Sequence, residues 1–211
     1  MDETVLWKLS YGMYALCADD NGRPVGCIVN TASQITSVNP IIAVSVNKNN
    51  YTYGVIGKTK KFALSILSEE TPAAAIGVLG YQSGKNTNKF EKVAYRLEQG
   101  LPILEEAICG WLICDVLSIV DCETHGIVLA RVSAAENGTA GQPMTYKYFH
   151  EVIKGKAPKN APTYREEKPA AEAPKYVCSV CGYIYEGDIA REPDTYVCPI
   201  CNAPKSAFAR K

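Results

Sequence analysis

Apolar and polar positions along the first 155 residues follow the two-residue alternation and short apolar runs of β-strands. Within MYALCADDNGRPVGCIVN the pattern predicts a strand, a turn at Asp20-Asn21-Gly22 and a second strand. It also predicts a buried strand over residues 40–46, PIIAVSV. Residues 110–135 are expected to form a pair of long strands that reverse near Asp121 to Thr124.

Two short helices are expected between these strands. Thr52 is the expected N-cap of TYGVIGKT, and Thr71-Pro72 is expected to begin PAAAIGVLG, with proline in the first turn. Several strands with few helices and no regular alternation of strand and helix favour a closed or partly closed antiparallel barrel. We therefore predict a mainly β fold with short helices for this part of the chain.

The pattern breaks at residues 155–175, GKAPKNAPTYREEKPAAEAPK, where prolines, Ala, Lys and Glu replace any apolar periodicity. Proline favours extended backbone and removes a hydrogen-bond donor, so this composition is typical of a semi-rigid linker. We place the boundary near Pro169. The predicted division is a first domain over 1–165, a linker over 166–175 and a second domain over 176–211.

Charge and composition exclude several functions. The 211 residues carry 22 Lys+Arg and 22 Asp+Glu, a formal net charge of zero, which offers no field for nucleic acid or anionic lipid. The start, MDETVLWKLS, has two acids where a secretory signal would have lysines, and no apolar stretch approaches the ~18 to 20 residues that span a bilayer. We expect a cytoplasmic protein with no nucleic-acid partner and no membrane partner.

The strongest chemical signal is a cysteine cluster near the end of the chain. Cys178 and Cys181 form one C-x-x-C pair, and Cys198 and Cys201 form another. Each pair can wrap a tight turn around one ion, and together they supply four thiolates in a tetrahedral array. A domain this short has too small an apolar core to fold without its ion. The spacing alone leaves open a structural zinc ribbon or an iron centre.

The residues around these ligands resemble rubredoxin, in the shortened form that ends many rubrerythrins. The resemblance is carried by CGYIYEG and CPICNAPKSAF and covers residues 176–208. It implies a rubredoxin-like metal-knuckle domain with one iron ion, cycling between ferric and ferrous, on the four cysteines. Backbone N–H groups near Gly182 are expected to point at the sulfurs, and Tyr183, Tyr196 and Phe208 to pack a dry shell. The remaining five cysteines lack ligand spacing and are expected to be ordinary strand residues: Cys17, Cys27, Cys109, Cys114 and Cys122.

The first domain lacks a dinucleotide-binding glycine motif, a P-loop, an E-x-x-H motif and a Ser-His-Asp set. Instead, several of its segments resemble the flavin reductase family. These segments run from about residue 6 to 164: LSYGMYALCADDNGRPVGCIVNTASQITSVNPIIAVSVNKNNYT, KFALSILSEETP, YQSGKNTNKF, ETHGIVLARV, PMTYKYF and GKAPKNAPTY. The resemblance implies an FMN-binding split β-barrel with bound FMN.

Small polar residues follow the second predicted strand. Asn30, Thr31, Ala32 and Ser33 offer small side chains and backbone groups that can approach a flat isoalloxazine ring and bond its pyrimidine edge. A polar turn leaving a strand would have the same composition. The family resemblance favours the flavin contact and adds Ser45 to it.

A phosphate site is expected where PIIAVSV ends and a helix begins. Lys48, Asn49 and Thr52 combine a cation with a helix N-terminus. The alternative is an ordinary N-cap at Thr52 and a solvated cation at Lys48. The resemblance favours the phosphate site and implies that Lys89, in NKF, lies near the same phosphate.

His125, in ETHGIVLARV, matches the family's histidine beside the flavin ring, where a nicotinamide would dock. The resemblance therefore makes it the catalytic residue, whereas a lone histidine can equally be packed or surface-bonded. Hydride transfer needs no protein base, so the protein's task is to stack the nicotinamide on the flavin and exclude water. Glu123 stands where the family has glycine.

Together the two domains suggest electron transfer from NAD(P)H to FMN, to Fe(Cys)4 and on to an external acceptor. Such fusions resemble the high-molecular-weight rubredoxins of anaerobes, which implies a redox partner such as a flavodiiron oxygen or nitric oxide reductase. The split-barrel family also implies a homodimer, which light scattering would test. Two alternatives stay open: a non-catalytic flavin-binding barrel with a structural zinc ribbon for docking, and a flavin reductase that releases FMNH2.

Overall fold

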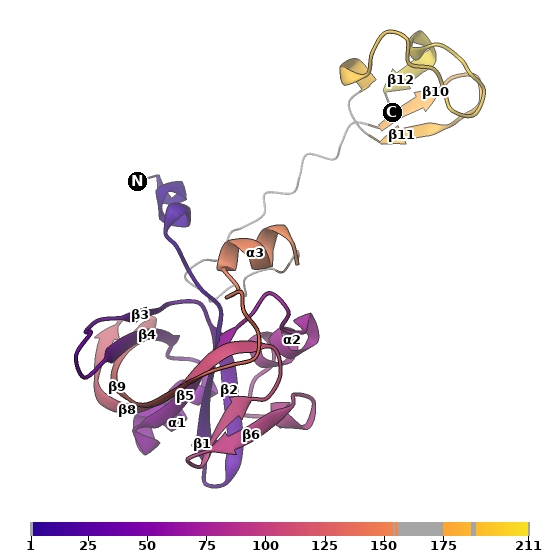
Figure 1. The fold of residues 1–211 in the computed structure, drawn as a ribbon. Helices are drawn as coiled ribbons and strands as arrows, with labels where there is room; N and C mark the ends of the chain where they lie inside the picture. Colours follow the sequence, from indigo (N-terminus) through magenta and orange to yellow (C-terminus); the bar gives the residue numbers. More distant parts are fainter. Residues whose placement is uncertain (1, 154, 156–174, 187–188, 211) are drawn as a thin grey trace. The chain divides into compact units, whose positions relative to one another are not determined.

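The structure is a computed structural model that describes residues 2–153, 155, 175–186 and 189–210. The chain forms two compact units, Met1–Tyr164 and Arg165–Lys211 (Figure 1). Apart from Lys175, the predicted linker 166–175 lies outside the described residues.

The first unit is mainly β, as predicted, with a seven-stranded antiparallel sheet in the order β2-β1-β5-β8-β9-β4-β3 and a separate β6-β7 pair. Its strands are β1 (Tyr14–Asp20), β2 (Arg23–Val29), β3 (Ala32–Gln34), β4 (Ile41–Asn47), β5 (Lys61–Leu67), β6 (Tyr95–Glu98), β7 (Leu101–Leu104), β8 (Ile108–Cys122) and β9 (His125–Asn137). Its helical segments are η1 (Glu3–Lys8), α1 (Tyr51–Thr59), α2 (Ala73–Tyr81), η2 (Lys89–Glu91) and α3 (Tyr146–Glu151).

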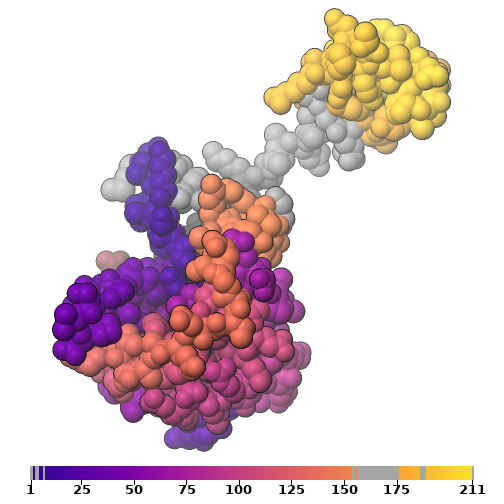
Figure 2. Space-filling view, viewed as in Figure 1, coloured from indigo at the N-terminus to yellow at the C-terminus, as the bar shows by residue number. Residues whose placement is uncertain are grey.

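The two predicted hairpins are confirmed. Asn21 and Gly22, both at positive φ (54° and 87°), connect β1 to β2, which is the backbone of a two-residue hairpin turn. The long hairpin β8–β9 reverses at Glu123 and Thr124 and contains two register shifts. Chain after β9 lies across the surface of this unit before it reaches α3 (Figure 2), and bridges from Gly12 and Ser68 hold it there.

The sheet of the first unit is buried on both faces. Neighbouring residues of β1 belong to different clusters, because successive side chains in a strand point to opposite faces: Leu16 packs in one and Cys17 in the other. α1 covers one face through Val55 and Ile56, and α2 covers the other through Ile76 and Leu79. This two-sided burial explains why β1 and β5 contain apolar runs.

The helix starts differ in detail from the prediction. The N-cap of α1 is Asn50, whose side-chain oxygen accepts a hydrogen bond from the Thr52 N–H at 3.1 Å, so the prediction of Thr52 as the cap is wrong. Asparagine is at least as good a cap as threonine, and NNYT offers several in succession. α2 begins after Pro72 without a side-chain cap. The Thr71 hydroxyl donates instead to the carbonyl of Ala107 at 2.6 Å.

The second unit is a small three-stranded sheet, in the order β11-β10-β12, with two short helical turns. Its elements are β10 (Lys175–Cys178), β11 (Ile184–Glu186), η3 (Ile189–Arg191), η4 (Lys205–Ala207) and β12 (Phe208–Arg210). The buried cluster of its described residues consists of Cys178, Cys198 and Ala203. Because two of these three are predicted metal ligands, the sulfurs themselves form the core.

Candidate functional site

The predicted flavin residues of the first unit are brought together by strand pairing. β3 pairs with β4, with Ala32 opposite Val44, and the Ser45 N–H donates to the Thr31 carbonyl at 3.0 Å. β4 pairs on its other side with β9, where Asn47 lies opposite His125. Segments that are almost a hundred residues apart in sequence therefore meet around the end of β4.

The N-terminus of α1 follows directly from this strand end. Thr52 in its first turn is 1% exposed, and its hydroxyl has no hydrogen-bond partner among the described residues. The Cys27 thiol interacts with the Thr52 and Asn50 side chains, and a thiol is only a weak hydrogen-bonding group. A buried hydroxyl that is poorly satisfied costs up to about 1–3 kcal/mol, and a helix N-terminus favours an anion. The residues present therefore fit a phosphate group.

Tyr51 holds this helix terminus in place. Its hydroxyl donates to Asp20 Oδ2 at 2.6 Å, and the Arg23 guanidinium lies 5.1 Å from the centre of its ring. Gly84 in the loop YQSGKN also lies near Tyr51, because a Cβ built on this glycine would lie 3.7 Å from the ring. The start of α1 is thus bonded to the end of β1 and lies near this loop.

Lys89 is placed differently from the expectation. Its side chain is 3% exposed, and Nζ donates to the carbonyls of Gly26 at 2.8 Å and Leu79 at 2.7 Å. Burial lowers the pKa of this ammonium group. Its described hydrogen bonds thus tie β2 to the last turn of α2, where a cation is favourable. They do not support the predicted phosphate contact.

Replacing Lys89 with methionine is expected to lower the free energy of unfolding of the first unit by about 2 kcal/mol, because two buried carbonyls lose their donor. Trp7 and Trp111 are the two tryptophans of the chain, so tryptophan fluorescence during urea unfolding reports on this unit alone. The exposed Lys85 supplies the control, Lys85→Met, which should unfold like the wild type. A Lys89→Met midpoint equal to that of the control would refute the structural role.

Lys48 is also engaged by the protein. Its ammonium group pairs with Asp121 Oδ2 at 2.6 Å, which raises the pKa of the lysine and lowers that of the aspartate. The backbone N–H of Lys48 donates to the Thr124 carbonyl at 3.0 Å. Asn49 donates its N–H to the Asn47 side chain at 2.9 Å. The segment between β4 and α1 is therefore joined to the β8–β9 turn rather than left as an open loop.

His125 is the first residue of β9 and is partly buried. Its Nδ1 lies 2.9 Å from the Thr124 hydroxyl, and burial lowers its pKa. The ring is therefore neutral at neutral pH. Next to it, a Cβ on Gly126 would lie only 2.6 Å from the Tyr53 ring, so glycine allows α1 to pack against the start of β9.

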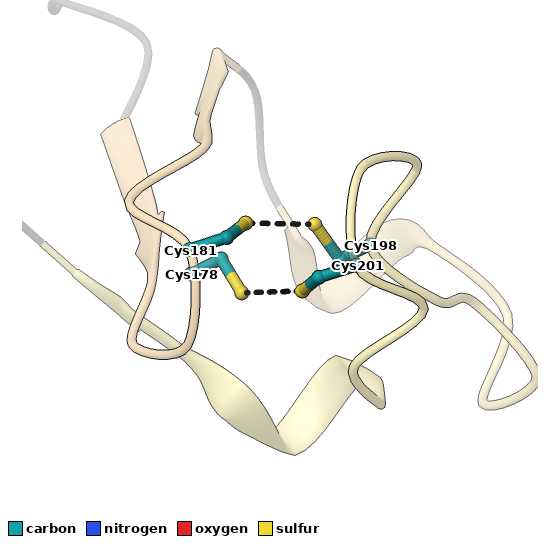
Figure 3. Close-up of side chains that lie close together, drawn as sticks. All are labelled: Cys178, Cys181, Cys198 and Cys201. Atoms are coloured by element: carbon teal, nitrogen blue, oxygen red, sulfur yellow. Dashed lines mark hydrogen bonds between the residues drawn. The ribbon is translucent and has the colours of Figure 1, made fainter.

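The second unit contains a four-cysteine site that could hold one metal ion. The sulfurs of its four cysteines all lie within 4.8 Å of one another (Figure 3). The Cys178–Cys201 and Cys181–Cys198 sulfur distances are 3.7 and 3.5 Å. Four sulfurs bound tetrahedrally at ~2.3 Å from one ion would be about 3.8 Å apart, so the arrangement fits a single tetrahedral ion.

The two C-x-x-C turns have the same backbone geometry. The residue after each second cysteine, Gly182 or Asn202, has a positive φ (75° and 56°), and its N–H donates to the carbonyl of the first cysteine at 2.8 and 2.9 Å. The Tyr183 N–H points at the Cys181 sulfur, and the Ala203 N–H at the Cys201 sulfur. The structure thus shows the predicted N–H groups directed at sulfur, which stabilise thiolate charge.

The thiols cannot all lose their protons without a cation. Loss of hydration acts to raise the pKa of Cys198, but the N–H groups of Cys201 and Ile200 outweigh it and lower the pKa to about 7. The Tyr183 N–H acts to lower the pKa of Cys181, yet desolvation and the neighbouring sulfurs raise it to about 12. A metal ion removes this mutual repulsion, so binding releases protons.

The aromatic shell around the centre is present. Phe208 lies 6.4 Å from Tyr183 and 5.8 Å from Tyr196, measured between ring centroids, and Tyr185 joins the group 5.6 Å from Tyr196. Tyr183 and Phe208 pack against the buried cluster of Cys178, Cys198 and Ala203. Cys178 and Cys198 are buried, whereas Cys181 is exposed.

The five other cysteines lie in strands of the first unit, as predicted. Burial raises the pKa of Cys27 to about 11 and that of Cys114 to about 12, so these thiols stay protonated. Cys17 is likewise fully buried, Cys109 is partly buried, and Cys122 is exposed at the end of β8.

The mainly β first unit and the four-cysteine second unit correspond to two known domain families, which define a flavin reductase-like protein with a rubredoxin-like domain. Residues 6–154 match the flavin reductase like domain family and residues 176–209 match the rubrerythrin, rubredoxin-like domain family. The chain belongs to the flavin reductase-like family. This membership implies a flavin, and the cysteine cluster implies a metal ion.

Individual relatives are similar to the whole chain or to most of it. A high molecular weight rubredoxin of Moorella thermoacetica is 39% identical over 99% of each chain. A ferric-chelate reductase (NAD(P)H) of Archaeoglobus fulgidus is 33% identical over 80% of this chain and all of its own. Among solved structures, an NADH:FAD oxidoreductase of Streptomyces globisporus has the same fold, with a TM-score of 0.62, 19% identity, and 67% of this chain and 83% of its own covered. In the described residues, no helix is long and apolar enough to cross a membrane.

Several site residues were missed by the sequence analysis. Asn50, Tyr51, Asp121 and Thr124 all fix parts of the site through contacts with other segments. Only Asn50 had a usable signal, because it directly precedes the helix as a strong capping residue. The partners of the others depend on strand pairing.

Proposed function

We propose that the protein accepts electrons from NAD(P)H on FMN, passes them to an iron ion on the four cysteines and delivers them to an external redox protein, with a flavodiiron reductase as the expected acceptor. The single observation that carries this proposal is the presence, on one chain, of a flavin-type unit and a tetrahedral four-sulfur centre. Covalent connection keeps the two units at high effective concentration.

Two groups of residues in the first unit would hold the flavin. Backbone and small side chains of Asn30–Ser33, which run beside β4, would bond the ring's polar edge together with Ser45. The buried Thr52 hydroxyl and the α1 N-terminus bind the phosphate. Bound FMN would accept a hydride and give up its electrons one at a time. His125 borders the place where the nicotinamide stacks, and its neutral ring excludes water without acting as a base.

The second unit holds the iron. Cys178 and Cys198 lie in the buried part of the cluster, whereas Cys181 is exposed at its edge. The N–H groups directed at the sulfurs stabilise their charge. Iron supplies a one-electron couple at this position. The exposed edge gives a short path for an electron to leave.

We retain the homodimer as a proposal from the family resemblance.

Anaerobic titration of protein from its native source with NADH tests the proposal. The flavin and iron absorption bands are expected to bleach together, with about three electrons taken up per chain, two by the flavin and one by the iron. A chain whose second unit contains zinc, or whose flavin band does not change on NADH addition, would exclude this function. If ultrafiltration of the reduced sample separates the flavin from the protein, the protein is instead a supplier of free FMNH2.

A further inference from the structure

The β8–β9 turn, residues 121–124, has an unusual backbone. Glu123 has a φ of 55°, which is unfavourable for a residue with a side chain. The Asp121 Oδ1 accepts a hydrogen bond from the Glu123 N–H at 3.0 Å. An aspartate that bonds a backbone N–H two residues later stabilises a turn from within. The carboxylate of Asp121 therefore holds the conformation that Glu123 would otherwise disfavour.

The same carboxylate fastens the turn to the segment between β4 and α1. Its Oδ2 pairs with Lys48 Nζ at 2.6 Å, and the Lys48 N–H donates to the Thr124 carbonyl at 3.0 Å. Asp121 is 73% exposed, so the ion pair alone contributes little stability. The importance of these contacts is geometric, because they join two separate segments at two points.

The fastened turn ends at His125. The Thr124 hydroxyl lies 2.9 Å from His125 Nδ1, and His125 is paired with Asn47 on one side and Cys122 on the other. A neutral imidazole can pair with the Thr124 hydroxyl through Nδ1 either as acceptor or as donor. The position of the imidazole is thus set by Thr124, whose own position is set by Asp121 and Lys48.

We propose that Asp121 is a positioning residue for His125: it closes the 121–124 turn, joins it to Lys48, and so holds the imidazole in one position and one tautomer for the docking nicotinamide. This inference rests on the proposed function of the first unit. It also assigns Lys48 to the turn instead of the flavin phosphate.

Three variants separate the two contacts of Asp121, which are the hydrogen bond from the Glu123 N–H and the ion pair with Lys48. Asp121→Ala removes both contacts, and Asp121→Asn keeps an oxygen for the Glu123 N–H but loses the charge. Asp121→Ala combined with Glu123→Gly restores the turn, because glycine adopts a positive φ freely. Asp115→Asn is the matched control, since Asp115 lies on the same strand and pairs with the exposed Lys61 at 3.4 Å.

In anaerobic stopped-flow, Asp121→Ala is expected to slow flavin reduction by NADH about 10- to 100-fold, the loss caused by displacing a positioned group by about 1 Å. Asp121→Asn should lose only a few-fold, and the double variant should recover most of the rate. FMN content and reduction by dithionite should match those of the control. Nitrogen NMR of His125 should show one predominant tautomer in the wild type and a tautomer mixture in Asp121→Ala.

Wild-type NADH kinetics in Asp121→Ala would overturn the inference, as would a loss of FMN content equal to the loss of rate. If NADH does not reduce the wild-type flavin at all, the proposed function fails. The NMR comparison still decides the positioning role in that case, because an unchanged His125 tautomer in Asp121→Ala would refute it.

Discussion

Cys198→Ser is expected to abolish the metal centre and unfold the second unit while the first unit stays folded. Cys198 is completely buried and belongs to the cluster of three buried residues that forms the core of this unit. A serine hydroxyl does not replace a thiolate as a ligand at neutral pH. Metal binding supplies about 10–16 kcal/mol to structural sites of this kind, far more than so small a core can replace.

Three measurements check this result. Metal analysis should fall from one ion per chain to none, and the dispersed proton NMR signals of the second unit should collapse. The tryptophan fluorescence transition should not move, because both tryptophans lie in the first unit. Cys109→Ser, whose thiol lies 3.9 Å from the Leu67 carbonyl, is the control that should keep its ion. A folded, metal-free second unit in Cys198→Ser would contradict the prediction.

Cys198→Ser also tests the two steps of the proposed electron transfer separately. NADH should still bleach the flavin of Cys198→Ser at the wild-type rate, because the residues around that site belong to the first unit. Reduction of an added acceptor protein should stop. Undiminished transfer to the acceptor would show that electrons leave from the flavin and that the metal centre has another role.

The metal centre could be predicted almost completely from the sequence because its determinants are local. Each C-x-x-C pair builds its own turn, and glycine or asparagine after the second cysteine supplies the positive φ that the turn needs. The hairpins of the first unit were predictable for the same reason, since Asn21-Gly22 defines a turn without help from the rest of the chain.

The contacts of the flavin unit depend on long-range pairing and were therefore not predictable. Nothing near Lys89 in sequence indicates that its ammonium group reaches the Gly26 carbonyl, and nothing near Lys48 indicates a bond to Asp121. Both lysines were expected near the flavin phosphate. Their described side-chain bonds are instead made to other residues of the protein. Sequence reasoning finds residue types that suit a ligand but cannot show whether the protein already uses them.

Thr52 shows the opposite situation, because its hydroxyl is buried and interacts only weakly, with the Cys27 thiol, among the described residues. Thr52→Val is therefore expected to change two quantities in opposite directions. The FMN-free protein should become more stable by about 1 kcal/mol, because a buried hydroxyl with only a weak thiol partner is removed. FMN should bind about 10-fold more weakly, because Thr52→Val removes the hydrogen bond between the hydroxyl and the phosphate. A hydrogen bond to a charged group contributes ~1.5–3 kcal/mol, and the remaining N–H groups of the helix terminus replace only part of it.

Riboflavin separates this effect from a general disturbance of the site. It has no phosphate, so its affinity should be the same in Thr52→Val and the wild type, and Thr52→Ser should restore FMN binding. Thr59→Val is the matched control on the same helix, because the Thr59 hydroxyl donates to the Val55 carbonyl at 3.1 Å. That variant should lose a little stability and keep its FMN affinity. Equal weakening of FMN and riboflavin by Thr52→Val would place the phosphate elsewhere, and a loss of stability would show that the hydroxyl is already satisfied within the protein.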